Sequence, residues 1–135
     1  MADRYAVIGN PVAHSRSPWI HAEFARQLRQ DIEYIRMEVP LDGFVGAVDT
    51  LRAIGGRGAN VTVPFKGEAH LYATSLTERA RAAGAVNTLA FDSGVARGDN
   101  TDGVGLLRDL MINLRRDIEG KRVLLLGAGG AAQGV

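Results

Sequence analysis

The stretch Tyr5-Ala6-Val7-Ile8-Gly9-Asn10-Pro11 begins with four apolar residues and ends in residues typical of a turn, so it predicts a short strand. A helix is expected to follow, because apolar residues recur at every fourth position between Ile20 and Leu28. Ser17 is a suitable N-cap for this helix, and Pro18 suits its first position. A strand joined to a helix is the unit from which α/β folds are built.

The following residues repeat this unit. Apolar side chains alternate with Arg36 and Glu38 over residues 35–39, as expected for a half-buried strand. Helical spacing returns over residues 44–51. Residues 59–63 then indicate a buried strand that is closed by a proline.

Three later elements are expected before the chain changes character. A short helix should open at a capping box formed by Ser75 and Glu78 and end at Gly84. Two apolar stretches flank Asp92-Ser93-Gly94, which predicts a hairpin. Apolar residues on one helical face predict a further helix over residues 107–114.

A new structural unit is expected near the C-terminus, after a charged stretch over residues 115–121 that has no apolar period. Val123-Leu124-Leu125-Leu126 predicts a parallel strand covered on both faces. The next residues, Gly127 to Ala132, match the pattern G-x-G-x-x-A, in which the glycines permit a tight turn and the approach of a pyrophosphate. The same pattern also occurs as an ordinary strand-to-helix turn.

Together these elements predict a three-layer α/β/α sandwich with a mostly parallel sheet, followed by the first strand and glycine loop of a truncated Rossmann domain. Residues 1–114 would form the first domain, residues 115–121 a linker, and residues 122–135 the start of a dinucleotide-binding domain. A complete dinucleotide unit needs about 30 residues, which residues 122–135 do not supply.

Composition narrows the function classes. A formal net charge of +1, with 46% hydrophobic and 23% charged residues, indicates a globular protein without a strong nucleic-acid or membrane field. The absence of cysteine excludes disulfides and thiolate chemistry and favours a reducing compartment such as the cytoplasm. The histidines, His14, His21 and His70, lack metal-ligand spacing, so no metal site is expected.

Polar side chains gather at predicted helix starts and strand ends. Ser15 and Ser17 precede the first helix, whose N–H groups and dipole can hold a carboxylate, although both also suit ordinary turn and cap positions. Thr62 and Lys66 follow the carboxyl end of a strand, where open α/β sheets bind ligands. A lone lysine, however, is usually a solvated charge.

Two further polar residues can join Lys66. Asn87 interrupts an apolar strand and needs hydrogen-bond partners, either from the backbone or from a ligand hydroxyl. Asp102 precedes a helix, where it or Thr101 can also be a plain N-cap. If Lys66 and Asp102 meet in a cleft, the carboxylate can hold the amine while the lysine exchanges a proton with a substrate oxygen. A nicotinamide would then carry the hydride.

Five motifs, in this order, make the sequence resemble the shikimate dehydrogenase family from end to end. They are Ile8 to Pro18, Asn60 to Lys66, Gly84 to Thr88, Gly98 to Gly103, and Gly127 to Ala132. The resemblance implies an NADP-dependent oxidoreductase that reversibly reduces 3-dehydroshikimate to shikimate, on the pathway through chorismate to aromatic amino acids.

The resemblance also implies a role for each matching residue. Lys66 and Asp102 would be catalytic. The substrate would be bound by Ser15, Ser17, Thr62, Lys66, Asn87 and Asp102, with the serines on its carboxylate. The NADP loop would begin with Gly127, Ala128, Gly129, Gly130 and Ala131, and Glu78 would lie on the cofactor side.

Several alternatives remain open. A quinate or shikimate dehydrogenase that uses NAD or NADP would share these motifs, and a homodimer is compatible with a full-length enzyme. A non-catalytic carboxylate-binding module, which belongs to another function class, could use the same helix terminus. Since the family continues through a second domain, we expect the 135-residue chain to lack turnover alone.

Overall fold

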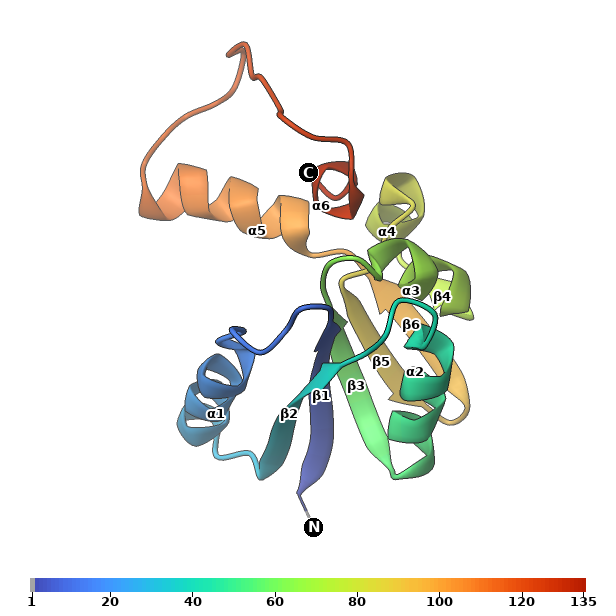
Figure 1. Cartoon of the computed structure of the whole chain (residues 1–135). Helices are drawn as coiled ribbons and strands as arrows, with labels where there is room; N and C mark the ends of the chain where they lie inside the picture. The colour runs from blue at the N-terminus through green and yellow to red at the C-terminus, as the bar shows by residue number, and fades with distance from the viewer. Residues whose placement is uncertain (1) are drawn as a thin grey trace.

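A computed structural model describes residues 2–135 and contains a six-stranded sheet in the order β2-β1-β3-β5-β6-β4 (Figure 1). The strands are β1 (Asp3–Gly9), β2 (Ile32–Glu38), β3 (Gly56–Val61), β4 (Ser75–Leu76), β5 (Thr88–Asp92) and β6 (Val95–Asp99). The helices are α1 (Ser17–Leu28), α2 (Phe44–Ala53), α3 (Lys66–Tyr72), α4 (Glu78–Ala83), α5 (Asp102–Arg108), the π-helical η1 (Asp109–Asn113) and α6 (Gly130–Gln133). Within residues 2–135, no helix has the length and apolar character needed to cross a membrane.

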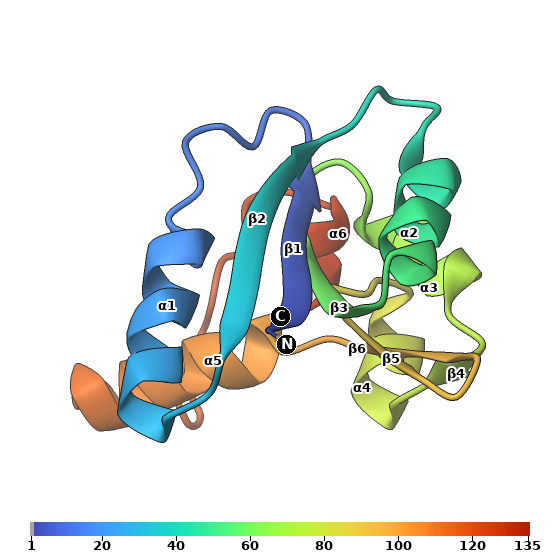
Figure 2. The same cartoon turned by 90° about the horizontal axis from the view of Figure 1, so that it is seen from below.

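Two strand–helix–strand units build the first half of the sheet. Strand β1 pairs in parallel with β2 on one side and with β3 on the other. Helix α1 lies on one face of these strands and α2 lies on the opposite face (Figure 2). This arrangement confirms the predicted α/β/α layers.

A hairpin supplies the antiparallel part of the sheet. Strand β5 runs antiparallel to both β3 and β6, while β4 pairs in parallel with β6. Ser93 and Gly94 form the two-residue turn, with φ angles of +48° and +86°. Three of the five strand pairings are parallel, so the predicted mostly parallel sheet with a hairpin is confirmed.

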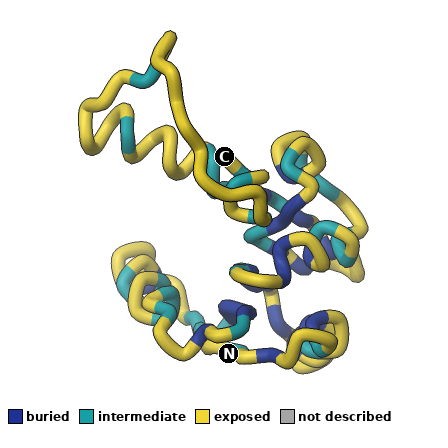
Figure 3. The backbone as a smooth tube through the Cα atoms, turned by 45° about the horizontal axis from the view of Figure 1, so that its top comes forward, coloured by how far each residue is buried: buried dark blue, intermediate teal, exposed yellow. Residues whose placement is uncertain are grey.

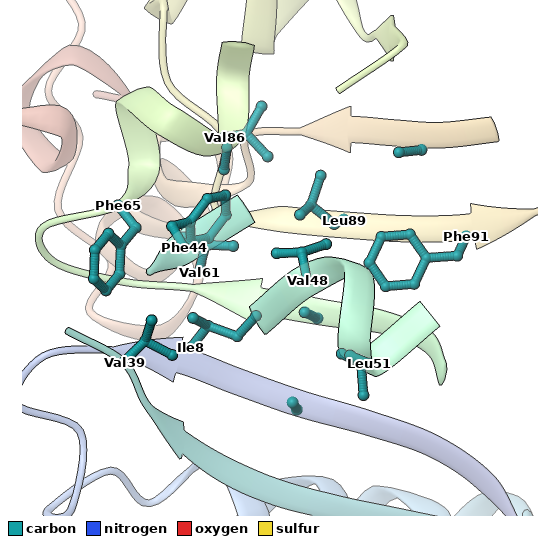
Figure 4. Packing of buried hydrophobic residues seen from close by; sticks show 14 of the residues in the cluster. Ile8, Val39, Phe44, Val48, Leu51, Val61, Phe65, Val86, Leu89 and Phe91 are labelled. Carbon is teal, nitrogen blue, oxygen red and sulfur yellow. The ribbon is translucent and has the colours of Figure 1, made fainter. Parts of the chain in front are cut away.

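The predicted apolar face of α2 packs into the core of the domain. Phe44, Val48 and Leu51 are almost fully buried and share one cluster with Ile8 of β1 (Figure 4). The ring of Phe44 stacks on that of Phe65, with centroids 5.4 Å apart. This packing holds the segment after β3 against α2, and Lys66 follows directly in that segment.

The predicted N-cap of α1 is displaced by one residue. Ser17 is already helical, and Arg16 occupies the cap position without a capping side-chain hydrogen bond. The Ser17 N–H donates instead to Ser15 Oγ, at 3.2 Å. A hydroxyl two residues upstream therefore accepts from the backbone N–H of the first helical residue, which has no partner within the helix.

The capping box predicted for α4 is wrong. Ser75 lies in β4, where its pairing with β6 draws it into the sheet. Thr77 caps the helix instead, and its Oγ1 accepts a hydrogen bond from the Ala80 N–H at 3.3 Å. Gly84 ends α4 with a φ of +60°, as predicted.

Helix α3 has no counterpart in the sequence-based expectations. Its seven residues are too few to show a helical period, and only Ala69 and Lys66 among them are buried. The strand expected to reach Val63 ends at Val61, and a turn then leads into the helix. As a result Lys66 is the first residue of a helix rather than the last residue of a strand region.

The C-terminal part of the chain differs from the prediction of a buried parallel strand. Residues 123–126 form no strand and are between 52% and 85% exposed. Figure 3 colours most of the backbone between α5 and α6 as exposed. A strand covered on both faces needs neighbouring strands, and none of the described strands pairs with these residues. The helix expected over residues 107–114 begins earlier, at Asp102, and leaves Leu107 and Met111 exposed.

The Asp99 carboxylate ties α4 to the end of β6. It accepts hydrogen bonds from Arg79 Nε and Nη2, at 2.7 and 2.5 Å, from Thr77 Oγ1 at 2.7 Å and from the Asn100 N–H at 2.8 Å. The Arg79 guanidinium makes the largest contribution to a pKa of about 2 for Asp99. A carboxyl group with a lowered folded-state pKa stabilises the fold above its unfolded pKa and loses that effect as the pH falls.

We expect Asp99→Asn to lower the free energy of unfolding at pH 6 by about 1 kcal/mol, a value reduced because Arg79 is half exposed. The difference from wild type should shrink as the pH falls from about 4 towards about 2, because the wild-type carboxyl becomes protonated there. Urea unfolding at pH 6 and pH 3 measures both effects. Asp92→Asn in the hairpin is the matched control, and the same pH dependence in all three proteins would contradict the assignment.

Candidate active site

The carboxyl ends of β1 and β3 lie side by side and lead into one cavity. Ile8 pairs with Val61, and the Thr62 N–H donates to the Ile8 carbonyl at 2.9 Å. Gly9 permits this approach, because a Cβ at that position would collide with the Thr62 methyl group. The loops that follow the two strands flank a cavity of about 480 Å³.

This cavity brings together every residue for which the sequence predicts substrate binding. The predicted residues come from five places: the start of α1, the end of β3, the start of α3, the start of β5 and the start of α5. The lining consists of Val7, Pro11, Val12, His14, Ser15, Ser17, Ile20, His21, Asn60, Val61, Thr62, Val63, Lys66, Asn87 and Asp102. The roles of these residues toward a substrate stay predictions.

An ion pair joins Lys66 and Asp102 at this cavity. Lys66 Nζ lies 2.5 Å from Asp102 Oδ2, and the two side chains are 11% and 26% exposed. The other carboxylate oxygen, Oδ1, accepts a hydrogen bond from Asn87 Nδ2 at 2.8 Å. Both carboxylate oxygens therefore have donors, which fixes the orientation of the carboxylate and the position of the amine.

Asn100 holds the backbone at Asp102. Its side chain is fully buried, and its Oδ1 accepts a hydrogen bond from the Asp102 N–H at 3.0 Å. Its Nδ2 donates to the Ala85 carbonyl at 3.0 Å. A buried amide thus connects the start of α5 to the segment that precedes β5.

The Asn87 amide has partners on both of its polar atoms. Its Oδ1 accepts from the Thr101 N–H at 3.0 Å and from Thr88 Oγ1 at 2.9 Å. Its Nδ2 donates to Thr101 Oγ1 at 2.9 Å as well as to Asp102. Protein groups therefore meet the hydrogen-bonding need of Asn87, which lies just before β5 rather than within the expected strand, and they direct its NH₂ group towards the catalytic candidate Asp102.

Two serine hydroxyls meet at the N-terminus of α1. Ser15 Oγ donates to Ser17 Oγ at 3.1 Å, and both residues line the cavity. Helix α1 has 12 residues, so its N-terminal N–H groups carry the partial positive charge of a full helix dipole. Hydroxyls and a positive helix end together favour a small anion such as a carboxylate.

Three side chains beside the cavity were not predicted as site residues. Tyr34 OH donates to Asn60 Oδ1 at 2.6 Å, and the Tyr34 ring stacks on His21 with centroids 4.2 Å apart. Burial raises the pKa of Tyr34 to about 12 and lowers the pKa of His21, so it favours the uncharged form of both groups. Asn60 interrupts an apolar strand as Asn87 does, and that interruption was the available sequence signal.

The glycine loop lies against the ion pair. Gly127 has a φ of +125°, and α6 begins at Gly130. A Cβ on Gly130 would lie 3.0 Å from the Lys66 Cβ, so the loop backbone contacts Lys66. Glu78 is exposed at the start of α4, outside the cavity lining, and its cofactor role stays a prediction.

A family model described as the shikimate dehydrogenase substrate binding domain matches residues 7–89. The shikimate dehydrogenase (NADP(+)) of Methylobacillus flagellatus is 65% identical over 133 residues, which is 98% of this chain and 49% of that protein. The protein of the same name from Cupriavidus necator is 66% identical over 133 residues, or 98% of this chain and 45% of that protein. The chain thus spans about half the length of the curated relatives it matches.

A solved structure shows the same fold. Shikimate 5-dehydrogenase from Thermus thermophilus, in complex with NADP(H) and shikimate, is 37% identical with a TM-score of 0.90. The match covers 98% of this chain and 50% of that chain. It confirms the predicted α/β fold class.

Proposed function

Since the chain belongs to the shikimate dehydrogenase substrate-binding domain family, we propose that it holds the substrate of an NADP-dependent shikimate dehydrogenase. The reaction is the reversible reduction of 3-dehydroshikimate to shikimate. The observation that carries the proposal is the Lys66–Asp102 ion pair in the same cavity as the paired serines. The serine pair suits the carboxylate of the substrate, and the Lys66–Asp102 pair suits the proton transfer that its reduction requires.

The substrate carboxylate would bind at the N-terminus of α1. Ser15 and Ser17 offer hydroxyl donors beside the N-terminus of α1, where the helix dipole favours a negative charge. Asn87 and Asp102 are held rigidly by protein hydrogen bonds and keep polar atoms at the cavity for the ring hydroxyls. Thr62 adds a hydroxyl from the end of β3. The ring would therefore be oriented from several elements at once.

Lys66 is the group that moves the proton. The Asp102 carboxylate pairs with Lys66 Nζ and keeps it at the cavity. In the reducing direction the ammonium donates a proton to the substrate carbonyl oxygen while the carbonyl carbon receives a hydride. In the oxidising direction the neutral amine takes the proton from the hydroxyl.

The glycine loop fits the pyrophosphate of NADP. Gly127 and Gly129 have open space where a side chain would lie, so a ligand can approach their backbone N–H groups. Residues 127–131 would hold the cofactor, which supplies or accepts the hydride when bound. The contact of Gly130 with Lys66 brings this loop to the proton-transfer group. A reducing compartment such as the cytoplasm suits a cysteine-free chain and is part of the proposal.

We expect the 135-residue chain to bind shikimate without oxidising it. A dinucleotide fold reads the ribose or its phosphate about 20 residues after the glycine loop, and residues 127–135 supply the loop alone. Calorimetry with shikimate measures binding, and NADPH absorbance measures turnover with NADP. Turnover above background, or no binding heat at millimolar shikimate, would contradict the expectation.

In a shikimate dehydrogenase that contains this chain together with a cofactor-binding domain (called the longer enzyme below), Lys66→Ala should lower kcat by about 10²–10⁴-fold, the usual contribution of a proton-transfer group. KM for shikimate should change by less than about tenfold, because the serines still bind the carboxylate. Steady-state kinetics with shikimate and NADP measures both constants. Lys121→Ala, at an exposed lysine, is the matched control, and wild-type kcat in Lys66→Ala would rule out the proposed role.

Ser15→Ala should act mainly on affinity. Loss of a hydroxyl donor to a charged group is expected to raise KM for shikimate by about tenfold, with kcat changed by less than about threefold. Ser75→Ala in β4, away from the cavity lining, provides the control. An unchanged KM would count against the carboxylate subsite, and equal kcat/KM for quinate would favour the broader dehydrogenase.

A further inference from the structure

Alternate side chains of the edge strand β2 project towards α1. Tyr34 stacks on His21 of α1, so Arg36 and Glu38, two and four residues later, lie on the same face of the strand. Met37 packs on the opposite side, against the main hydrophobic cluster. Arg36 and Glu38 are exposed and charged, and the sequence offered no role for them beyond the polar positions of a half-buried strand.

Both side chains hold the loop that carries Ser15. Arg36 Nε and Nη2 donate to the Ser15 carbonyl oxygen at 2.8 and 2.6 Å. Glu38 Oε2 accepts a hydrogen bond from the Val12 N–H at 3.1 Å. Between these two points the Ser15 N–H donates to the Val12 carbonyl at 2.9 Å, which closes a turn. The loop is therefore fixed at both ends of this turn by one strand.

The three hydrogen bonds from Arg36 and Glu38 act on the backbone of residues that line the cavity. Val12 and Ser15 belong to the lining described above, whereas Arg36 and Glu38 do not. A carbonyl oxygen that points into an anion site would repel a carboxylate. The Nε–H and Nη2–H groups of Arg36, which form a fork of two donors, bind the Ser15 carbonyl oxygen and hold it on the β2 side of the loop. A charge-assisted bond to that carbonyl also polarises the Ser15–Arg16 peptide, which strengthens the donor character of its N–H.

We propose that Arg36, supported by Glu38, is a positioning residue for the carboxylate subsite and sets its selectivity for anionic substrates through the Ser15 loop. This inference rests on the proposed function, because it takes Ser15 and Ser17 as the carboxylate ligands. Arg36 acts without touching the substrate. Its two parallel N–H donors matter as well as its charge, since lysine cannot reproduce the fork.

The test compares two substrates in the longer enzyme: shikimate and its carboxamide, which lacks the negative charge. Arg36→Met should raise KM for shikimate by about tenfold, with kcat within about twofold. KM for the carboxamide should change by less than about twofold. Arg36→Lys should restore only part of the loss, and Arg57→Met, which removes an exposed arginine paired with Asp3, should leave all constants unchanged.

Glu38 provides a second, independent pair of variants. Glu38→Gln keeps an oxygen acceptor for the Val12 N–H, whereas Glu38→Met removes it. We expect the glutamine variant to retain most of the selectivity for shikimate over the carboxamide and the methionine variant to lose it. These variants, with Arg36→Lys, decide the proposal even if Arg36→Met does not fold.

A double-mutant cycle separates this inference from the proposed function. If Arg36 and Ser15 act through one loop, the double variant should have a KM for shikimate less than about twofold above that of Ser15→Ala alone. Equal loss for shikimate and carboxamide, full rescue by Arg36→Lys, or independent effects of the two substitutions would overturn the positioning role. An unaffected Ser15→Ala enzyme would instead overturn the proposed function.

Discussion

A largely buried lysine ammonium requires a partner, and the arrangement of the cavity follows from that constraint. Asp102 supplies the opposite charge to Lys66 at 2.5 Å, but an unrestrained carboxylate would turn to solvent. Asn87 holds one carboxylate oxygen, and Asn100 holds the backbone N–H of the same residue. Each polar group that stabilises the pair is itself hydrogen-bonded, so the ion pair, the Asn87 amide and the start of α5 form one connected unit.

The mixed sheet explains how these groups reach Lys66. Strands β1 and β3 are parallel, so their carboxyl ends meet at one edge. Strand β5 is antiparallel to β3, and β6 is antiparallel to β5. The start of β5 and the end of β6 therefore lie at that same edge, where Asn87 precedes one strand and Asp102 follows the other. In a wholly parallel sheet, the start of β5 would lie at the opposite edge, and Asn87 would be far from Asp102.

Local sequence signals predicted the parts of the fold that depend on local physics. The core face of α2, the turn at Ser93-Gly94 and the left-handed end of α4 all followed from apolar spacing or from glycine. The cap at Ser75 failed because the pairing of β4 with β6 draws that residue into the sheet. At Ser17 the helix begins one residue earlier than expected, and the nearby Ser15 hydroxyl accepts the Ser17 N–H. Strand formation at residues 123–126 depends on neighbouring strands and so is not a local property. Arg36 shows the same limit at the site, since alternation predicts its face but cannot reveal its contact with the Ser15 carbonyl.

The contact of Gly130 with Lys66 gives a second reason for a glycine at this position of the loop. In dinucleotide-binding loops a missing side chain is usually explained by the space that phosphate needs. Here an alanine at position 130 would place its Cβ only 3.0 Å from the Lys66 Cβ. Lys66 would have to move by a few tenths of an ångström, in the side chain whose tip is held by Asp102. A glycine at position 130 therefore leaves the Lys66 side chain undisturbed, whereas a larger residue there would shift one member of the Lys66–Asp102 pair.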